Sequence, residues 1–292
     1  MIRLQESLHK TPIVRMLGNG GGLSYDMDNT NFTVLDYFLI DCGRSTYPKL
    51  VKEGLIDKLK YVFITHHHDD HIGSLSSFWY YKILIQKENP TVVVPEYLKD
   101  YTRNFVCTGI VKYPMFGRFT SPDDHGMIKA YGHTVQEKFT VKDFHRNEFL
   151  LTIKIIPVPY GGYGHIDARY STLMVKFDFF GNGINFTLVF TGDIKPSKEL
   201  VKIFEDCRNL DGLYIFHDLS LNPSVENIHP TIQEIDQLYP DKIKERLICV
   251  HTRLPNYRAT WRLEDFMSNK PVRDIAYQMS FDYMKQIAKE AQ

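Results

Sequence analysis

Cysteine is scarce in this sequence, and long apolar runs are absent from it. The four cysteines among 292 residues lie far apart and show no CxxC spacing. That pattern favours reduced thiols over a disulfide framework or a zinc–thiolate site. No apolar stretch approaches the roughly 20 residues of a membrane-spanning helix, and residues 1–6 lack the apolar core of a signal peptide. We therefore expect a soluble, cytoplasmic protein without a membrane partner.

The sequence also lacks an excess of charge of either sign. Thirty-five Lys and Arg residues balance thirty-five Asp and Glu residues. We expect no long nucleic acid as a partner, because such binding depends on many contacts between cations and phosphates. A net charge of zero does not exclude a local basic patch or a small anionic substrate. With 43% hydrophobic and 13% aromatic residues, the composition is globular, and the length suits one elaborated α/β domain over residues 1–292.

Histidine, in contrast, is concentrated in one stretch. Four of the twelve histidines lie in Thr65–Gly73, which reads THHHDDHIG. Imidazole nitrogens and carboxylate oxygens are ligands that Zn²⁺ and similar ions prefer. The apolar residues 61–64 precede this stretch and predict a buried strand that ends where the polar side chains begin. The sequence therefore predicts a metal site at the carboxyl end of a strand.

The spacing within the stretch indicates two metal ions. His66 and His68 can turn to one side of a tight loop, while Asp70 and His71 serve a neighbouring position. A solvated polar loop is the alternative, but a strand before the loop and a helical pattern after it argue against that alternative.

An apolar strand followed by a potential ligand recurs along the chain. Residues 150–159 lead into a glycine-rich loop that contains His165. Residues 185–190 lead to Asp193, whose carboxylate could bridge two cations about 3.5–4 Å apart. The pattern occurs again at Asp41, His217-Asp218 and His251.

The histidine stretch resembles that of the metallo-β-lactamase superfamily of metal-dependent hydrolases, and the resemblance implies an αββα sandwich. Thr191-Gly192-Asp193 is similar to the superfamily's bridging-aspartate motif. Residues 39–43 (LIDCG) resemble its first motif. In that motif the aspartate, here Asp41, binds no metal and supports the histidine loop through hydrogen bonds.

This resemblance, together with the strand-end pattern, gives a ligand set for two divalent ions, with Zn²⁺ preferred and Mn²⁺ as the alternative. The first ion would take His66, His68, His165 and Asp193. The second ion would take Asp70, His71, Asp193 and His251. Two such ions lower the pKa of a shared water and favour hydrolysis, and a His/Asp ligand set without cysteine suits phosphate esters.

Within the superfamily the sequence is most similar to the RNase Z branch. The similarity rests on the glycine loop 17–22 (LGNGGG), on the two motifs above, and on degenerate forms of two others, His217–Ser220 and His229–Thr231. By this resemblance Asp218 orients His229, which donates a proton to the leaving oxygen, and Asp70 belongs to the catalytic set. A capping aspartate and an unrelated loop histidine remain the alternative.

One departure from the RNase Z pattern narrows the substrate. A single hairpin fills the sequence between His165 and Asp193, where tRNA-processing members carry a long basic arm. The chain therefore looks most like the phage anti-Pycsar phosphodiesterases, which lack the arm. That resemblance implies hydrolysis of 3′,5′-cyclic mononucleotides to linear monophosphates, to counter a defence signal in the host cytoplasm, by a homodimer. The alternatives are an RNase Z-like endoribonuclease acting on tRNA precursors or short RNA, and a non-catalytic nucleotide-binding module.

Three further residues are candidates for substrate contact. Tyr160 and Tyr163 flank glycines before His165 and could stack on a base, an interaction of about 1–3 kcal/mol. Arg253 could neutralise phosphate charge, although a surface role is an equal alternative.

Apolar patterning outlines the rest of the domain. Strands are expected at 11–17, 32–42, 91–94, 171–180 and 213–216, and helices at 45–54, 74–86, 95–105 and 196–204. Residues 107–148 contain many Pro and Gly residues and predict an irregular insertion with some β character. Helices are expected to fill the C-terminal region, 260–290, the longest of them over 272–288.

Overall fold

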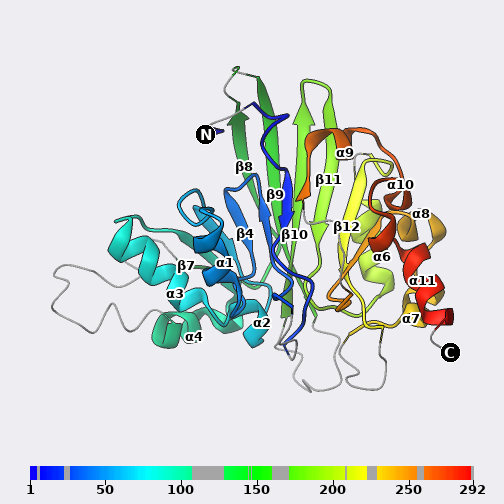
Figure 1. Ribbon diagram of the computed structural model, residues 1–292, viewed down its shortest axis with the longest axis horizontal. Coiled ribbons are helices and arrows are strands. Elements are labelled where there is room, and N and C mark those ends of the chain that lie inside the picture. Colours follow the sequence, from blue (N-terminus) through cyan, green and yellow to red (C-terminus); the bar gives the residue numbers. More distant parts are fainter. Residues whose placement is uncertain are drawn as a thin grey trace.

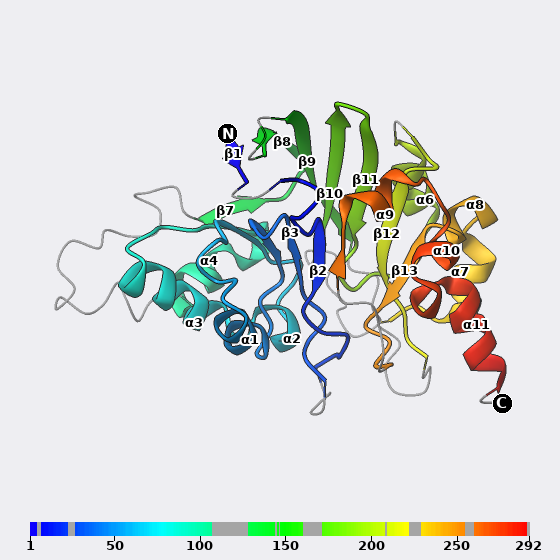
Figure 2. The same ribbon diagram turned by 45° about the horizontal axis from the view of Figure 1, so that its top comes forward.

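Two seven-stranded sheets pack face to face in the computed structural model, and helices cover their outer faces (Figure 1). The structure describes residues 1–4, 7–22, 27–106, 128–143, 145, 147–159, 171–207, 209–221, 229–254 and 260–290. Turning the molecule shows one group of helices on each side of the paired sheets (Figure 2). This four-layer arrangement confirms the predicted αββα sandwich. Among the described residues, no helix is long and apolar enough to cross a membrane.

The first sheet has the strand order β14-β2-β3-β4-β5-β6-β7. Its members from β14 to β4 pair antiparallel, and those from β4 to β7 pair parallel. Helices α1 (Thr46–Lys52) and α3 (Leu75–Tyr80) cover it. The strands are β2 (Val14–Met16), β3 (Phe32–Val34), β4 (Phe38–Ile40), β5 (Tyr61–Phe63), β6 (Thr91–Pro95), β7 (Ile128–Tyr131) and β14 (Thr260–Trp261).

The second sheet has the order β1-β8-β9-β10-β11-β12-β13. It is antiparallel from β8 to β11 and parallel from β11 to β13. Helices α6 (Lys198–Glu205), α7 (Ile232–Leu238), α8 (Asp241–Lys244) and α11 (Phe281–Glu290) lie on its outer side. The strands are β1 (Ile2–Arg3), β8 (Val135–Lys142), β9 (Glu148–Pro159), β10 (Ser171–Gly181), β11 (Ile184–Phe190), β12 (Leu213–Asp218) and β13 (Leu247–Val250).

The main hydrophobic core lies between the two sheets and is rich in aromatic rings. Phe38 of the first sheet contacts Phe177 of the second, with 5.5 Å between ring centroids. Phe32 and Phe190 meet in the same way at 5.0 Å. Because side chains alternate along a strand, the intervening residues of the central strands pack against the outer helices. Both faces of these strands are therefore apolar, which explains their nearly continuous hydrophobic sequence.

The prediction of one strand over residues 32–42 is wrong, because a tight turn divides it into β3 and β4. Leu35 and Asp36 have φ angles of 55° and 48°, the left-handed conformation of a two-residue hairpin turn. Asp36 stabilises the turn by accepting hydrogen bonds from Thr33 Oγ1 (3.0 Å) and Arg15 Nε (2.9 Å). The apolar Leu35 hid this turn in the sequence.

The prediction of helices throughout 260–290 needs two corrections. Thr260–Trp261 is the edge strand β14, paired with β2. The predicted helix 272–288 is divided into α10 (Val272–Ile275), a 3₁₀ turn at Tyr277–Met279 and α11. The division occurs where Ala276 adopts φ −151° and Ser280 forms an isolated bridge with Ile248. Pairing with the sheet thus overrides the helical pattern.

Two other segments also differ in detail from their expected form. The described part of the expected insertion, residues 128–143, 145, 147 and 148, contains two regular strands, β7 in one sheet and β8 in the other. Pro95 ends β6, and the short helical turns that follow begin at Glu96. Residues 107–127 lie outside the described part of the chain.

Candidate metal centre

The polar side chains predicted to form a site gather at one edge of the sandwich, where parallel strands of both sheets end. The histidine loop follows β5 and enters the short helix α2 (Asp69–Ile72). Asp193 follows β11, Asp218 ends β12, and His251 follows β13. The two sheets therefore contribute to one cluster, in which residues far apart in sequence become neighbours.

Asp193 lies between two histidines of the loop. Its Oδ2 is 3.6 Å from His66 Nε2, and its Oδ1 is 3.3 Å from His71 Nε2. Each carboxylate oxygen thus faces a different imidazole, which is the arrangement that a bridging carboxylate requires. All three side chains are buried, and their potential ligand atoms lie within 4.8 Å of one another.

Asp70 and His251 form a second part of the cluster. Asp70 Oδ2 is 3.0 Å from His251 Nε2 and 3.5 Å from His71 Nε2. These three side chains make another group whose potential ligand atoms lie within 4.8 Å. Asp70 and His251 thus lie next to the group of His66, His71 and Asp193, and His71 belongs to both groups.

His71 provides a direct test of whether a cation fits this cluster. Its Nδ1 donates a hydrogen bond of 2.8 Å to Asp41 Oδ2. Its Nε2 is buried and has no hydrogen-bond partner, although it faces the carboxylates of Asp70 and Asp193. A neutral imidazole held by a carboxylate in this way presents its other nitrogen as a ligand. The residues present therefore suit a divalent cation.

Asp41 ties the strand β4 to the histidine loop. Besides His71, it accepts hydrogen bonds from Thr65 N (2.7 Å) and Thr65 Oγ1 (2.9 Å). Burial raises the pKa of the Asp41 carboxyl, and the contacts with His71 and Thr65 partly oppose that rise. Asp41 thus holds the histidine loop at two points, at Thr65 at its start and at His71 in its second half.

The pKa shifts in the cluster reflect three buried carboxylates, Asp41, Asp70 and Asp193, next to imidazoles. Burial lowers the pKa of His66 well below its usual range. Burial also opposes charge on His71, but Asp193, Asp70 and Asp41 together raise its pKa well above the usual range. Burial disfavours the charged forms of Asp70 and Asp193, yet the nearby histidines lower the pKa of both carboxyls. This accumulation of negative charge favours a cation.

His229 and Asp218 lie beside the same cluster. His229 Nδ1 is 2.8 Å from Asp218 Oδ2 and 3.7 Å from Asp193 Oδ2. The His229 ring is 4.7 Å from the ring of His251, centroid to centroid. Asp218 Oδ1 is buried and has no hydrogen-bond partner, so this carboxylate could orient His229 and also face a cation.

The neighbouring His217 has a different environment. It is fully buried, with its Nδ1 2.7 Å from the Asp218 carbonyl oxygen and its Nε2 2.8 Å from Tyr239 Oη. Both ring nitrogens are thus engaged within the core. His217 supports β12 and is turned away from the cluster of carboxylates.

The glycine loop approaches the cluster closely. A Cβ atom on Gly21 would lie 2.6 Å from His251 Cε1, and one on Gly22 would lie 3.3 Å from Asp70 Oδ1. Glycine is therefore needed here to let the backbone pass. The loop therefore lies directly beside His251 and Asp70.

Asn19 and Thr252 are site residues that the sequence reasoning missed. Asn19 Nδ2 donates a hydrogen bond of 2.8 Å to Thr252 Oγ1, and Arg253 N donates one of 3.1 Å to the Asn19 carbonyl. These bonds fasten the glycine loop to a segment in which His251 and Arg253 have φ angles of 64° and 58°. Only the position of Asn19 within LGNGGG could have signalled this role.

The remaining candidates differ in how far the structure places them. His68 Nδ1 is 3.0 Å from His66 Nε2, so His68 lies at the cluster. Arg253 is exposed and follows His251 closely. His165, Tyr160 and Tyr163 lie outside the described residues.

Comparisons with known proteins identify relatives of this chain. A family model described as Anti-Pycsar protein Apyc1 matches residues 13–267. The Apyc1 protein of Paenibacillus harenae is 30% identical over 246 residues, which cover 82% of this chain and 88% of that protein. Ribonuclease Z of Thermococcus sibiricus is 24% identical over 276 residues, covering 84% of this chain and 87% of that protein.

A solved structure shows the same architecture. The metallo-β-lactamase fold protein YhfI from Bacillus subtilis superposes with a TM-score of 0.52 at 14% identity, over 90% of this chain and 92% of that chain. Together with the two facing sheets, this likeness establishes the metallo-β-lactamase fold. The family match extends over most of the sequence and over both sheets, and on this basis the chain belongs to the anti-Pycsar protein Apyc1 family.

Proposed function

We propose that this protein hydrolyses 3′,5′-cyclic mononucleotides to linear nucleoside monophosphates at a pair of divalent cations. As a member of the Apyc1 family with this buried cluster, it is a metal-dependent hydrolase. The observation that carries the proposal is the position of Asp193, with one carboxylate oxygen toward His66 and the other toward His71. A carboxylate placed in this way suits a two-cation centre, and such centres act on phosphodiesters.

Each cation would have its own set of ligands. His66, His68, His165 and Asp193 would hold the first cation, and Asp70, His71, Asp193 and His251 the second. Zn²⁺ suits this combination of imidazole and carboxylate, and Mn²⁺ is the alternative. When bound, the cations supply Lewis-acid chemistry toward the phosphate.

In this proposal His229 is the general acid. Asp218 accepts a hydrogen bond from Nδ1–H, which holds the ring in one orientation and favours the imidazolium form, whose Nε2–H is the proton to be transferred. A water oxygen forms a new P–O bond while the P–O3′ bond breaks, and O3′ takes the Nε2 proton of His229. One proton of the water stays on the new phosphate hydroxyl, and the other is released to solvent, from which His229 is protonated again. Such a proton transfer contributes about 10²–10⁴-fold in rate.

Asp70 in α2 contacts both His251 and His71, and in this proposal it belongs to the catalytic set.

Substrate contacts complete the proposal. Arg253 would neutralise phosphate charge, and Tyr160 and Tyr163 would stack on the base. A homodimer is part of the same proposal, and its test is the molar mass of the metal-loaded protein in solution by light scattering.

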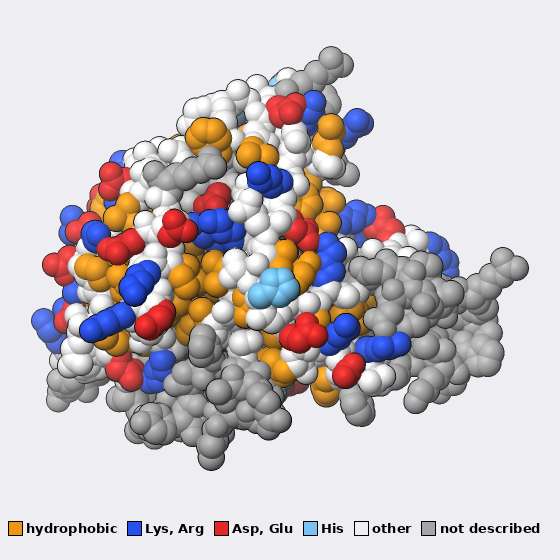
Figure 3. Space-filling view, turned by 180° about the vertical axis from the view of Figure 1, so that it is seen from behind, with side chains coloured by type: hydrophobic (Ala, Val, Ile, Leu, Met, Phe, Trp, Pro, Cys, Tyr) orange, Lys and Arg blue, Asp and Glu red, His pale blue; other side chains and the backbone are white. Residues whose placement is uncertain are grey.

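An RNase Z-like endoribonuclease is the second candidate, because a ribonuclease Z is among the relatives. The charge distribution favours the first candidate. Figure 3 shows cationic and anionic side chains interspersed over one face of the molecule, without an extended basic area. Together with the net charge of zero, this gives little attraction for a polynucleotide. A binding module without catalysis is the third reading.

One assay distinguishes the three candidate functions, which are hydrolysis of cyclic nucleotides, cleavage of RNA and binding without catalysis. The metal-loaded protein is incubated with a panel of cyclic purine and pyrimidine mononucleotides, and separately with precursor tRNA and short RNA. We expect linear monophosphates from the cyclic nucleotides, loss of turnover with a chelator, and intact RNA. Cleavage of RNA alone would support the endoribonuclease, and the absence of any turnover at full metal occupancy would support the binding module.

A further inference from the structure

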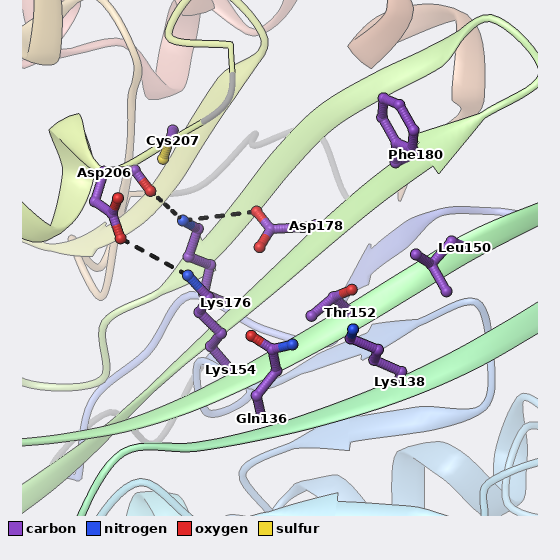
Figure 4. A pocket seen from close by; sticks show the side chains of 10 residues that line it. All are labelled: Gln136, Lys138, Leu150, Thr152, Lys154, Lys176, Asp178, Phe180, Asp206 and Cys207. Atoms are coloured by element: carbon purple, nitrogen blue, oxygen red, sulfur yellow. Dashed lines mark hydrogen bonds and ion pairs between the residues drawn. The ribbon is translucent and has the colours of Figure 1, made fainter.

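A second polar pocket lies on the outer face of the second sheet, away from the metal cluster. Its volume is about 330 Å³, and strands β8, β9 and β10 form its floor (Figure 4). Among the described residues, the helices of this layer gather toward β12 and β13, and only Asp206 and Cys207, which follow α6, border the pocket from that side (Figure 1). Small-molecule sites start at roughly this volume, about 300 Å³.

Strand register places like charges together in this pocket. Lys154 of β9 is directly opposite Lys176 of β10. Lys138 of β8 is paired with Thr152, one row away on the same face. Like charges on neighbouring strands destabilise a sheet unless something neutralises them. Three lysine side chains share this face with only two acidic residues, Asp178 and Asp206.

Each of these acidic residues pairs with a different lysine, Asp178 with Lys176 and Asp206 with Lys154. Lys176 is buried, donates a hydrogen bond of 2.8 Å to the Asp206 carbonyl, and lies 3.6 Å from Asp178 Oδ1. Lys154 Nζ is 3.7 Å from Asp206 Oδ2, but the Asp206 side chain is 83% exposed. Such an exposed pair contributes little. Lys138 has no ion pair among the described residues. Little negative charge therefore offsets the positive charges of Lys138 and Lys154.

The opposite end of the pocket is apolar. Phe180 is 47% exposed and stands across from Leu150 in the register of β9 and β10. In Figure 4 its ring lies beyond Asp178, away from the lysine side chains. The pocket thus has a cationic end and an aromatic wall, the two features that bind a phosphate joined to a flat ring.

We propose that this pocket binds a phosphomonoester that carries a flat ring, such as a nucleoside monophosphate. Lys138 and Lys154 are diagonal neighbours on β8 and β9, about 7–8 Å apart at the backbone, so their flexible side chains can reach one phosphate. The ring then lies against Phe180 and Leu150. None of these residues belongs to the metal cluster, so this site is independent of the function proposed above.

The test is a calorimetric titration of the metal-loaded protein with 5′-AMP and with inorganic phosphate, repeated after addition of a chelator. We expect saturable binding of 5′-AMP that persists with chelator. The double variant Lys138→Glu, Lys154→Glu should weaken it at least tenfold. Phe180→Ala should weaken binding of 5′-AMP and leave binding of phosphate unchanged. Lys52→Glu, an exposed charge reversal in α1 on the other sheet, is the matched control and should change nothing.

A second readout separates this pocket from the active centre. The double variant should hydrolyse bis(p-nitrophenyl) phosphate at the rate of the unaltered protein. The proposal is overturned if no binding of 5′-AMP persists with chelator at millimolar concentration, or if the double variant binds 5′-AMP as tightly as the Lys52→Glu control.

Discussion

At the scale of single residues, the cluster depends on carboxylates that orient imidazoles. Asp41 holds His71 and Asp218 holds His229, each through a hydrogen bond of 2.8 Å to Nδ1. In each case the carboxylate fixes which nitrogen carries the proton. The two pairs therefore have the same local chemistry but different expected roles, because His71 faces the carboxylates of the cluster and His229 lies at its margin.

Replacing Asp41 should weaken metal binding without removing a ligand. Asp41→Asn takes a charge-assisted acceptor from His71, and losses of this kind typically cost about 10–100-fold in metal affinity. Competition with a chromophoric chelator measures this affinity. Asp143→Asn is the control, since Asp143 accepts hydrogen bonds from Leu8 and Asn147 far from the cluster. Equal metal affinity in the two variants would contradict the role of Asp41.

Replacing His229 should reduce turnover and leave metal content unchanged. For His229→Ala we expect a fall in kcat of about 10²–10⁴-fold, with metal stoichiometry measured on the same sample by atomic emission. His133→Ala removes an exposed histidine as the control. Loss of a metal equivalent in His229→Ala would instead make this residue a ligand.

At the scale of elements, the strands place the ligands and the loops fix their orientation. The glycine loop shows this, because the absence of side chains lets Gly21 lie close to His251 and Gly22 lie close to Asp70. A Cβ on Gly21 would lie 2.6 Å from His251 Cε1, and one on Gly22 would lie 3.3 Å from Asp70 Oδ1. The bond from Asn19 to Thr252 then keeps the two loops together. The geometry of the second cation site is thus set partly by a segment that contributes no ligand.

Gly21→Ala should disturb that second site selectively. Its Cβ would lie 2.6 Å from His251 Cε1, so the ring or the loop must shift. We expect loss of one of two metal equivalents in a calorimetric titration. Gly132→Ala provides a matched control, since its Cβ would make ordinary contacts with the Glu96 side chain, at 3.5 Å from Cβ and 3.9 Å from Cγ. Unchanged binding of two equivalents by Gly21→Ala would contradict the close approach.

The helix α7 allows a prediction on pH dependence. Lys195 Nζ donates to both carboxylate oxygens of Glu234, at 2.9 and 2.8 Å, and to the carbonyl of His229. Burial raises the pKa of Glu234, but Lys195 outweighs that effect and the pKa is lowered. A lowered pKa in the folded state stabilises the protein above the unfolded pKa of about 4.3. This contribution is lost as pH falls through the folded pKa.

Glu234→Gln isolates this contribution. Glutamine keeps an oxygen for the hydrogen bond from Thr231 N in the capping box of α7, and it removes only the charge. Between neutral pH and about pH 4, urea unfolding of the variant should lose less free energy than that of the unaltered protein. Equal losses would show that the ion pair, which is partly exposed, has no effect on stability.

The sequence predicted most of the strands because their signal is local. Apolar runs that end in a polar residue located β5, β11, β12 and β13, and with them most of the cluster. The turn at Leu35-Asp36 escaped prediction because its left-handed residues include no glycine. The division of the C-terminal helix escaped because it depends on a bridge from Ser280 to Ile248, and the bond from Asn19 to Thr252 joins segments at opposite ends of the chain.

At the scale of the whole molecule, the fold concentrates negative charge at one edge of a nearly neutral protein. Asp41, Asp70, Asp193 and Asp218 are all buried there. On the face seen in Figure 3, the described side chains of both signs are interspersed. This arrangement suits a small phosphate ester held by cations better than a polynucleotide held by the surface. We therefore expect water to attack the phosphorus atom of the proposed substrate, a cyclic mononucleotide, at this edge.

Hydrolysis of a 3′,5′-cyclic mononucleotide in H₂¹⁸O tests that claim most directly. The metal-loaded protein should give a linear monophosphate with one ¹⁸O in its phosphate group and none in the ribose, as read by mass spectrometry. No product at full metal occupancy, or ¹⁸O in the ribose, would contradict the account.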